Sequence, residues 1–368
     1  MKLNKDIFIA QDNAQASLAY NLIATTLSPV RYGVLPGNDP FRVQIAVDNQ
    51  NVAKVTVISC QAITRAGIPI MVNAGDNTNS TDGNPSVTLQ INTGNTDLTY
   101  WAVLLAKPYE RHPFGDINPG ENPARFPFVK PGYEVVLVDD SQFNQYAQHP
   151  LALIIGKLIA RGGNIVVDDE YIPPCISVSA SQDLVGLYSE LDGFLAGLEQ
   201  SCSQIVQKIY RKSQQNDLSE LAQFLCDRIM LFLGQGITEY RWLDIHESPV
   251  KMISTIAGLA RVIKNTIDLR IGSGKDELMT YLCEWCELNP GELEGLLGNM
   301  AALRYNHNDI NQNVNSLIEF AKIMGKLFAT LSNLEFIGKK KDSGLFVKEE
   351  LQPAQTADAA KARRRFFG

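Results

Sequence analysis

Apolar and polar residues alternate through the first half of the chain and recur at helical spacing through the second half. Alternation over short runs, as in residues 41–47 and 52–58, is the pattern of a half-buried β-strand. The same pattern predicts further strands at residues 68–72, 87–91, 100–106 and 133–138. Clusters of Asn, Asp, Gly, Ser, Thr and Pro between these runs predict loops. Short strands with long turns favour an antiparallel β-sandwich.

Two helices are also expected in this first half. The apolar group Ile7, Phe8 and Ile9 leads into residues 14–20, which predict a short helix. Residues 143–160 predict a helix that closes the sandwich.

The second half predicts four long amphipathic helices. Apolar residues between Leu184 and Ile209 follow one another at spacings of three and four, which places them on one face of a helix. Similar stripes cover residues 218–232, 252–267 and 310–331, and Gly or Pro residues separate them. The sequence therefore predicts an α+β fold, with an N-terminal antiparallel β-sandwich followed by an antiparallel four-helix bundle.

A short proline-containing segment separates the two halves. Pro173 and Pro174 lack backbone N–H groups and hold Ile172 extended, so no helix can run through them. Ser179 and Gln182 have the spacing of a capping box at the start of the first long helix. The expected domains are a sandwich over 1–172, a linker over 173–178, a bundle over 179–336 and a basic, mostly disordered tail over 337–368.

Charge is distributed unevenly along the 368 residues. The net charge is −7, yet the tail from residue 339 onward carries eight Lys or Arg against four Asp or Glu. An acidic body argues against nucleic-acid binding. The six cysteines lie mostly in apolar surroundings, which is typical of buried thiols in a reducing compartment. No apolar run approaches the roughly 20 residues that a membrane-spanning helix needs, and no signal peptide is evident, so a cytoplasmic protein is expected.

Motifs that carry chemistry are incomplete. Residues 272–275 (Gly-Ser-Gly-Lys) lack the remainder of a phosphate-binding loop and read better as a helix end and turn. Cys283 and Cys286 form a lone CxxC with no further metal ligands nearby, and residues 76–80 lack the glycine and acid of a calcium loop. Four scattered histidines accompany no catalytic motif. We therefore expect no enzyme activity and no catalytic, cofactor-binding or metal-binding residue.

The region around the linker resembles the TssK family of type VI secretion baseplate proteins. The resemblance rests on Ile172-Pro173-Pro174, on the serines and leucines that follow, on Tyr32-Gly33-Val34 and on residues 131–138. The N-terminal Trp and Pro-Gln-His-Phe residues of the family are missing, and only Phe8, Ile9 and Gln15 have equivalents there. About 30 residues follow the expected bundle, which is too few for the C-terminal head domain of the family.

The resemblance implies a non-enzymatic, cytoplasmic component of a contractile injection machine, at the face of the baseplate nearest the inner membrane. It implies a homotrimer whose sandwich binds the wedge proteins TssF and TssG. We expect wedge binding by the N-terminal segment, with candidate residues Ile7, Phe8, Ile9 and Gln15. An adaptor of a phage or other contractile tail is the alternative, and an enzyme is a third class.

Two other interaction sites are predicted. Part of the helical stripe is expected to be buried between protomers of the trimer. The candidate residues of this seam, which belongs to the trimer or to the bundle, are Leu184, Leu187, Leu191, Leu198 and Ile205. The C-terminus ends with three arginines beside two phenylalanines, a combination favoured at interfaces. We expect it to dock on another component, such as a member of the membrane complex, through Arg363, Arg364, Arg365, Phe366 and Phe367.

Overall fold

A computed structural model describes residues 4–338 except 74–82, 92–96, 118 and 121. Contacts between residues divide the chain into two compact units. The N-terminal unit contains Met1–Ser181 together with Asn306–Asn311, and the C-terminal unit contains Gln182–Tyr305 and Gln312–Gly368. The short segment Asn306–Asn311 therefore belongs to the N-terminal unit, although the residues before and after it in sequence belong to the C-terminal unit. We call it the interhelix segment, because it follows the helix Pro290–Ala301 and ends at the first residue of the helix Asn311–Asn333.

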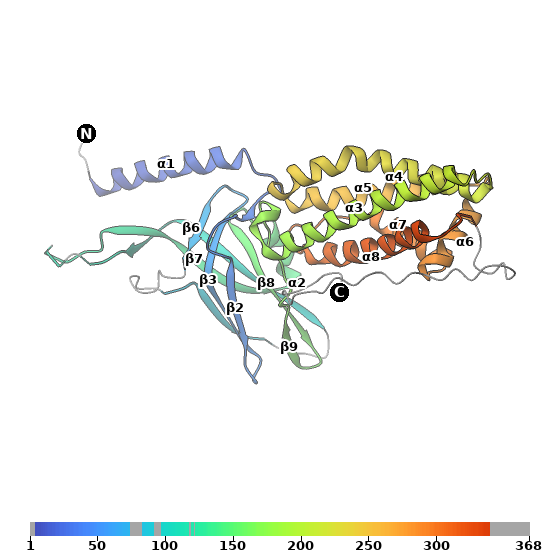
Figure 1. The fold of residues 1–368 in the computed structure, drawn as a ribbon. Coiled ribbons are helices and arrows are strands. Elements are labelled where there is room, and N and C mark those ends of the chain that lie inside the picture. Colours follow the sequence, from blue (N-terminus) through green and yellow to red (C-terminus); the bar gives the residue numbers. More distant parts are fainter. Residues whose placement is uncertain (1–3, 74–82, 92–96, 118, 121, 339–368) are drawn as a thin grey trace. The chain divides into compact units, whose positions relative to one another are not determined.

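The N-terminal unit is a sandwich of two antiparallel sheets (Figure 1). Strand β3 (Val52–Ile63) is the centre of one sheet and pairs with all four of its other strands. The second sheet has the order β7-β6-β8-β9. Besides β3, the helices and strands of the N-terminal unit are, in chain order, α1 (Lys5–Ala24), β1 (Gly33–Val34), β2 (Arg42–Val47), β4 (Pro69–Val72), β5 (Ser86–Gln90), β6 (Leu98–Phe114), β7 (Phe128–Asp139), α2 (Asp140–Ala147), β8 (Ala152–Arg161) and β9 (Asn164–Val167).

The core of the sandwich lies between the sheets. Val55 and Val57 of β3 pack in one buried cluster with Leu104 of β6 and Leu153 of β8. Every second residue from Ala53 to Ser59 of β3 is buried, so the alternation in this part of the sequence becomes one buried face. The predicted sandwich and the six predicted strands are confirmed.

The predicted helix over 143–160 is wrong. Only its beginning is helical, in α2, and the rest is strand β8, which pairs with both β6 and β9. The first five residues of β8 are all buried, so the strand has apolar residues on both faces. A continuous apolar run of this kind cannot be distinguished from a buried helix by its periodicity.

The C-terminal unit is a bundle of helices. Its four long helices are α3 (Gln182–Arg211), α4 (Asp217–Trp242), α5 (Pro249–Asp268) and α8 (Asn311–Asn333), which confirm the four predicted ones and lie side by side in Figure 1. Two short helices, α6 (Lys275–Cys286) and α7 (Pro290–Ala301), complete it. These two were missed because 12 residues give too few turns to establish a helical period.

The start of α3 differs in detail from the prediction. Residues 178–180 form a short 3-10 turn and α3 begins at Gln182. Ser179 therefore lies in the turn, where its hydroxyl is 2.9 Å from the hydroxyl of Ser177, and the predicted capping box with Gln182 is not formed.

The incomplete motifs have structural roles. Lys275 is the first residue of α6 and its ammonium group contacts Asp268 at 2.8 Å and Glu294 at 2.9 Å. Burial raises the pKa of Cys283 to about 12, so this thiol is protonated at neutral pH. Residues 76–80 lie outside the described residues. Within the described part of the chain, no helix combines the length and the hydropathy of a membrane span.

Candidate functional site

Helix α1 makes polar contacts with the sandwich along one of its sides. The hydroxyl groups of Ser17 and Tyr109 are 2.8 Å apart, and the guanidinium group of Arg111 lies 3.4 Å from the carboxylate of Asp12. Near its end, the backbone of Tyr20 passes close to Gly67, where an added Cβ would lie 2.4 Å from the Tyr20 carbonyl oxygen. The positive φ of 77° at Gly67 and this close approach both require glycine.

The opposite side of α1 presents a continuous stripe to solvent. We call it the outer stripe; it consists of Phe8, Gln11, Gln15, Leu18 and Leu22. These positions follow one another at spacings of three, four, three and four, so they lie on one face of the helix. The side chain of Phe8 is 54% exposed, and those of Leu18 and Leu22 are each 62% exposed. All 20 residues of α1 are described, and none of them is fully buried.

The predicted wedge-binding residues therefore divide into two groups. Phe8 and Gln15 belong to the outer stripe, whereas Ile7 and Ile9 are half-buried. Leu18 and Leu22 were not predicted as site residues, although their spacing from Phe8 is visible in the sequence. The signal was missed because the expected helix began only at residue 14.

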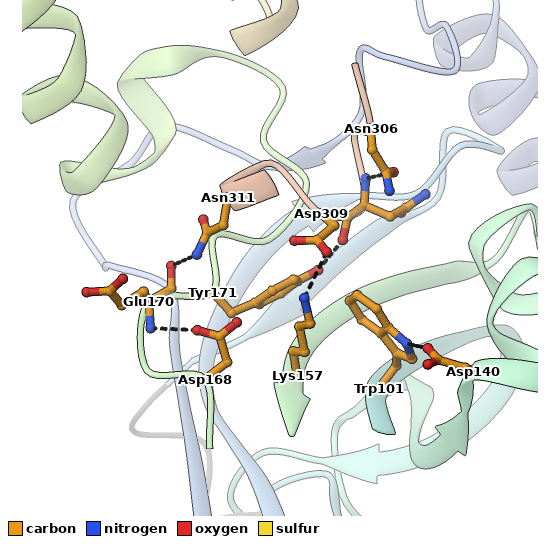
Figure 2. A network of polar contacts seen from close by, with 10 residues as sticks. Trp101, Asp140, Lys157, Asp168, Glu170, Tyr171, Asn306, Asp309 and Asn311 are labelled. Carbon is orange, nitrogen blue, oxygen red and sulfur yellow. Dashed lines mark hydrogen bonds and ion pairs between the residues drawn. The ribbon is translucent and has the colours of Figure 1, made fainter. Parts of the chain in front are cut away.

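The interhelix segment forms the second notable feature, a polar network with the sandwich (Figure 2). Asn308 accepts a hydrogen bond from the Tyr32 hydroxyl at its side-chain oxygen (2.7 Å) and one from the Tyr171 hydroxyl at its carbonyl (2.8 Å). The side-chain amide of Asn311 donates to the carbonyl of Glu170. In the contacts of Tyr171 and Asn311, a side chain donates to a backbone carbonyl, which gives backbone groups outside helices and strands a hydrogen-bond partner.

An ion pair lies within this network. The ammonium group of Lys157 on β8 contacts Asp309 at 2.9 Å, and the two side chains are only 19% and 12% exposed. The same ammonium group lies 5.0 Å from the centre of the Trp101 ring, whose N–H donates to Asp140 at 2.7 Å. A charge pair this far from water needs both partners, because removing one leaves the other buried and unpaired.

His307 is buried against Tyr32. Its Nε2 is 2.9 Å from the Tyr32 carbonyl oxygen, to which it donates, and the two rings meet edge to face at 4.7 Å. Burial lowers the pKa of His307 to about 4 and raises the pKa of Tyr32 to about 12. Both groups are therefore neutral at physiological pH, which fits a structural contact.

The predicted linker is packed inside the N-terminal unit. Ile172 is buried, and the carbonyl of Pro174 accepts a hydrogen bond from the Val34 N–H at 2.7 Å. Gly33 has a φ of 110°, and a Cβ there would lie 2.0 Å from the Pro174 carbonyl oxygen. The Tyr-Gly-Val and Ile-Pro-Pro sequences are thus direct neighbours in space, with glycine required at their contact.

The predicted protomer seam is enclosed within one chain. Each of the following side chains is at most 1% exposed in the bundle: Leu184, Leu187, Leu191, Leu198 and Ile205. They form the seam of the bundle itself. The predicted docking residues 363–367 lie outside the described residues.

A family of known proteins matches part of the chain in sequence. Residues 110–230 match a family described as "Bacterial Type VI secretion, VC_A0110, EvfL, ImpJ, VasE". The matched stretch begins near the C-terminal end of β6, continues through the linker and α3, and ends within α4. The expected resemblance to a type VI secretion family is therefore confirmed over these residues.

Two solved structures are also similar to the chain. One is titled "Crystal structure of TssK" (TM-score 0.48, 13% identity), and the match covers 87% of this chain and 66% of that one. The other is titled "Structure of TssK from T6SS EAEC in complex with nanobody nb18" (TM-score 0.45, 15% identity), with 87% and 99% covered. No curated protein matches the chain in sequence.

Proposed function

We propose that this chain is a structural component of a type VI secretion baseplate and that its N-terminal unit binds the wedge proteins TssF and TssG. The family match over residues 110–230 supports the secretion system. The outer stripe of α1 is the observation that carries the binding site. This helix exposes large apolar side chains along one face, while its other side is attached to the sandwich.

The stripe has the geometry of a surface that another helix covers. Spacings of three and four residues give the narrow seam by which two helices pack in a coiled coil. Covering Phe8, Leu18 and Leu22 would contribute about 1–2 kcal/mol for each side chain, because each still exposes 54–62% of its surface in the free chain. Helix–helix contact would also stabilise α1, since most of the stability of a helix in a protein comes from tertiary packing of its apolar face.

Replacing both Phe8 and Leu18 with serine is expected to weaken co-purification with TssF and TssG about tenfold or more. The two side chains are 54% and 62% exposed in the free chain, so burying the remaining area contributes about 1.7 kcal/mol at the lower estimate. Both are exposed in the free chain, so the melting temperature is expected to change little. Titration of the purified wedge proteins, with calorimetry of the free variant, measures both quantities.

A second pair of exposed apolar residues provides the control. Leu269 and Ile271 follow α5 and are 70% and 69% exposed. Their replacement by serine removes similar apolar area from the C-terminal unit and should leave wedge binding unchanged. Undiminished binding by the Phe8→Ser/Leu18→Ser variant would rule out the outer stripe as the site.

The homotrimer is part of the same proposal. The seam residues are buried in one chain, so contacts between protomers would use other surface; exposed apolar residues of the C-terminal unit include Leu231, Trp242 and Leu243. Light scattering is expected to give three times the chain mass of 40.6 kDa, about 122 kDa. A mass near that of one chain at micromolar concentration would contradict it.

The proposed function also includes a location: the protein would lie in the cytoplasm, at the face of the baseplate nearest the inner membrane.

A further inference from the structure

Helices α7 and α8 border a groove in the C-terminal unit that the proposed function does not use. Its volume is about 510 Å³. The apolar residues that line it are Leu288, Leu296, Met300 and Ile323. Two glutamates, Glu292 on α7 and Glu319 on α8, line it as well and are exposed. The groove therefore combines an apolar lining with negative charge.

The two glutamates are able to accept a cationic ligand. Within the described part of the chain, Glu319 has no ion pair. Glu292 uses one carboxylate oxygen to cap α7, accepting from the Asn289 N–H at 3.0 Å. The nearby cation Lys326 is paired with Glu287 at 3.2 Å, and Glu287 does not line the groove. A ligand suited to this site carries guanidinium or ammonium groups next to aromatic or aliphatic side chains.

The chain itself contains such a ligand. We propose that the C-terminal segment Arg363–Phe367 binds the groove between α7 and α8 of the same chain. Phe366 and Phe367 would occupy the apolar lining, and the three arginines would pair with Glu292 and Glu319. Arginine forms two parallel hydrogen bonds with a carboxylate, so a pair of glutamates can hold adjacent guanidinium groups.

The connection is long enough for this contact. The described chain ends at Gly338, whose N–H donates to the Tyr281 hydroxyl at 3.0 Å on α6. Ile323 lies ten residues before the end of α8 at Asn333, or about 15 Å along the helix. About 25 residues join Gly338 to Arg363, and a chain with the average dimensions of a flexible linker of that length spans about 28 Å.

Attachment to the same chain also strengthens the contact. A tethered ligand acts at an effective concentration on the order of millimolar, so even weak intrinsic affinity keeps the groove filled. This distinguishes the proposal from docking of the same residues on another component, in which the tail would have to be free. The inference does not depend on wedge binding by α1.

A photo-crosslinking experiment on the full chain tests the proposal. Phe366 is replaced by p-benzoylphenylalanine, and equal amounts of light and isotopically heavy chains are unfolded and refolded together before irradiation, so that any oligomer contains both forms. We expect the mapped crosslinks to reach α7 and α8, at or beside Leu296 and Ile323, and to join residues of one isotopic form. Crosslinks between light and heavy chains alone would assign the groove to a neighbouring copy and overturn the proposal, as would crosslinks located elsewhere.

Two charge reversals test the specificity of the contact. Glu319→Lys is expected to reduce the yield of these crosslinks about tenfold, because it removes one attractive pair and adds a repulsive one. Asp227→Lys reverses an exposed acid in the middle of α4, outside the groove, and should leave the yield unchanged. A yield that is insensitive to Glu319→Lys would refute the assigned site, while binding of the wedge proteins would remain a separate measurement.

Discussion

Replacing Lys157 with methionine is expected to lower the free energy of unfolding of the N-terminal unit by about 3–5 kcal/mol. The substitution leaves Asp309 charged and only 8% exposed, and the Asp309 Oδ1 atom already has no hydrogen-bond partner within the described residues. The methionine side chain can still pack on the Trp101 ring. The loss of stability is therefore caused mainly by the unpaired Asp309 carboxylate. Chemical denaturation followed by 19F NMR of 5-fluorotryptophan measures it, because Trp101 lies in this unit and Trp242 and Trp285 in the other.

Two further variants define the cause. Arg161 is on the same strand as Lys157 and pairs with Asp97 at 3.0 Å, but its side chain is 75% exposed. Arg161→Met should therefore have little effect on stability. In the double variant Lys157→Met/Asp309→Leu no buried charge remains, and most of the lost stability should return. If Lys157→Met and Arg161→Met lowered the free energy of unfolding equally, the buried ion pair would contribute no more to stability than the exposed one.

Acidification from pH 7 to pH 4.5 is expected to destabilise the N-terminal unit by about 2–3 kcal/mol through His307. The folded pKa of about 4 lies below the ordinary value of 6.5, so the unfolded chain binds the proton first as the pH falls. The stabilising contribution is complete above about pH 6.5 and is lost on the way down to pH 4. His307→Gln keeps a side-chain N–H that can donate to the Tyr32 carbonyl but does not titrate, so it should remove this part of the pH dependence.

The C-terminal unit provides an internal contrast. Asp244 is 1% exposed, and burial raises its pKa to about 6, above its ordinary value of 3.8. Here the folded state binds the proton first, so acidification through pH 6 favours folding of this unit. Denaturation of the wild type and His307→Gln at a series of pH values, read separately at Trp101 and at Trp242, distinguishes the two effects. An unchanged pH dependence at Trp101 in the variant would exclude His307 as the cause.

Local pattern was sufficient for most elements of the fold. Strand β3 alternates because one of its faces packs in the core, and α3 repeats at three and four residues because one of its faces does. These periods come from the backbone geometry of each element and are readable without knowing its neighbours. Strand β8 was misread because it is buried on both faces, a property set by the strands and core around it.

The candidate sites were harder to predict from the sequence. Phe8 and Gln15 could be selected through the resemblance, but which side of α1 faces solvent depends on contacts such as Ser17 with Tyr109, which are 92 residues apart. The same holds for the leucines of α3, whose stripe fits either a bundle interior or a contact between protomers. Only their burial within a single chain shows that the bundle itself uses them.

The sequence by itself determined the α+β class, the order of the main elements, the proline-containing linker and the resemblance to a type VI secretion family. Each of these depends on neighbours in sequence, on turn chemistry or on a linear motif. Tertiary structure alone decided that Asn306–Asn311 belongs to the sandwich, where Asp309 meets Lys157 and His307 meets Tyr32. These partners are 152 and 275 residues apart, and a polar side chain in a loop carries no local signal of the charge or carbonyl that it will meet once the chain has folded.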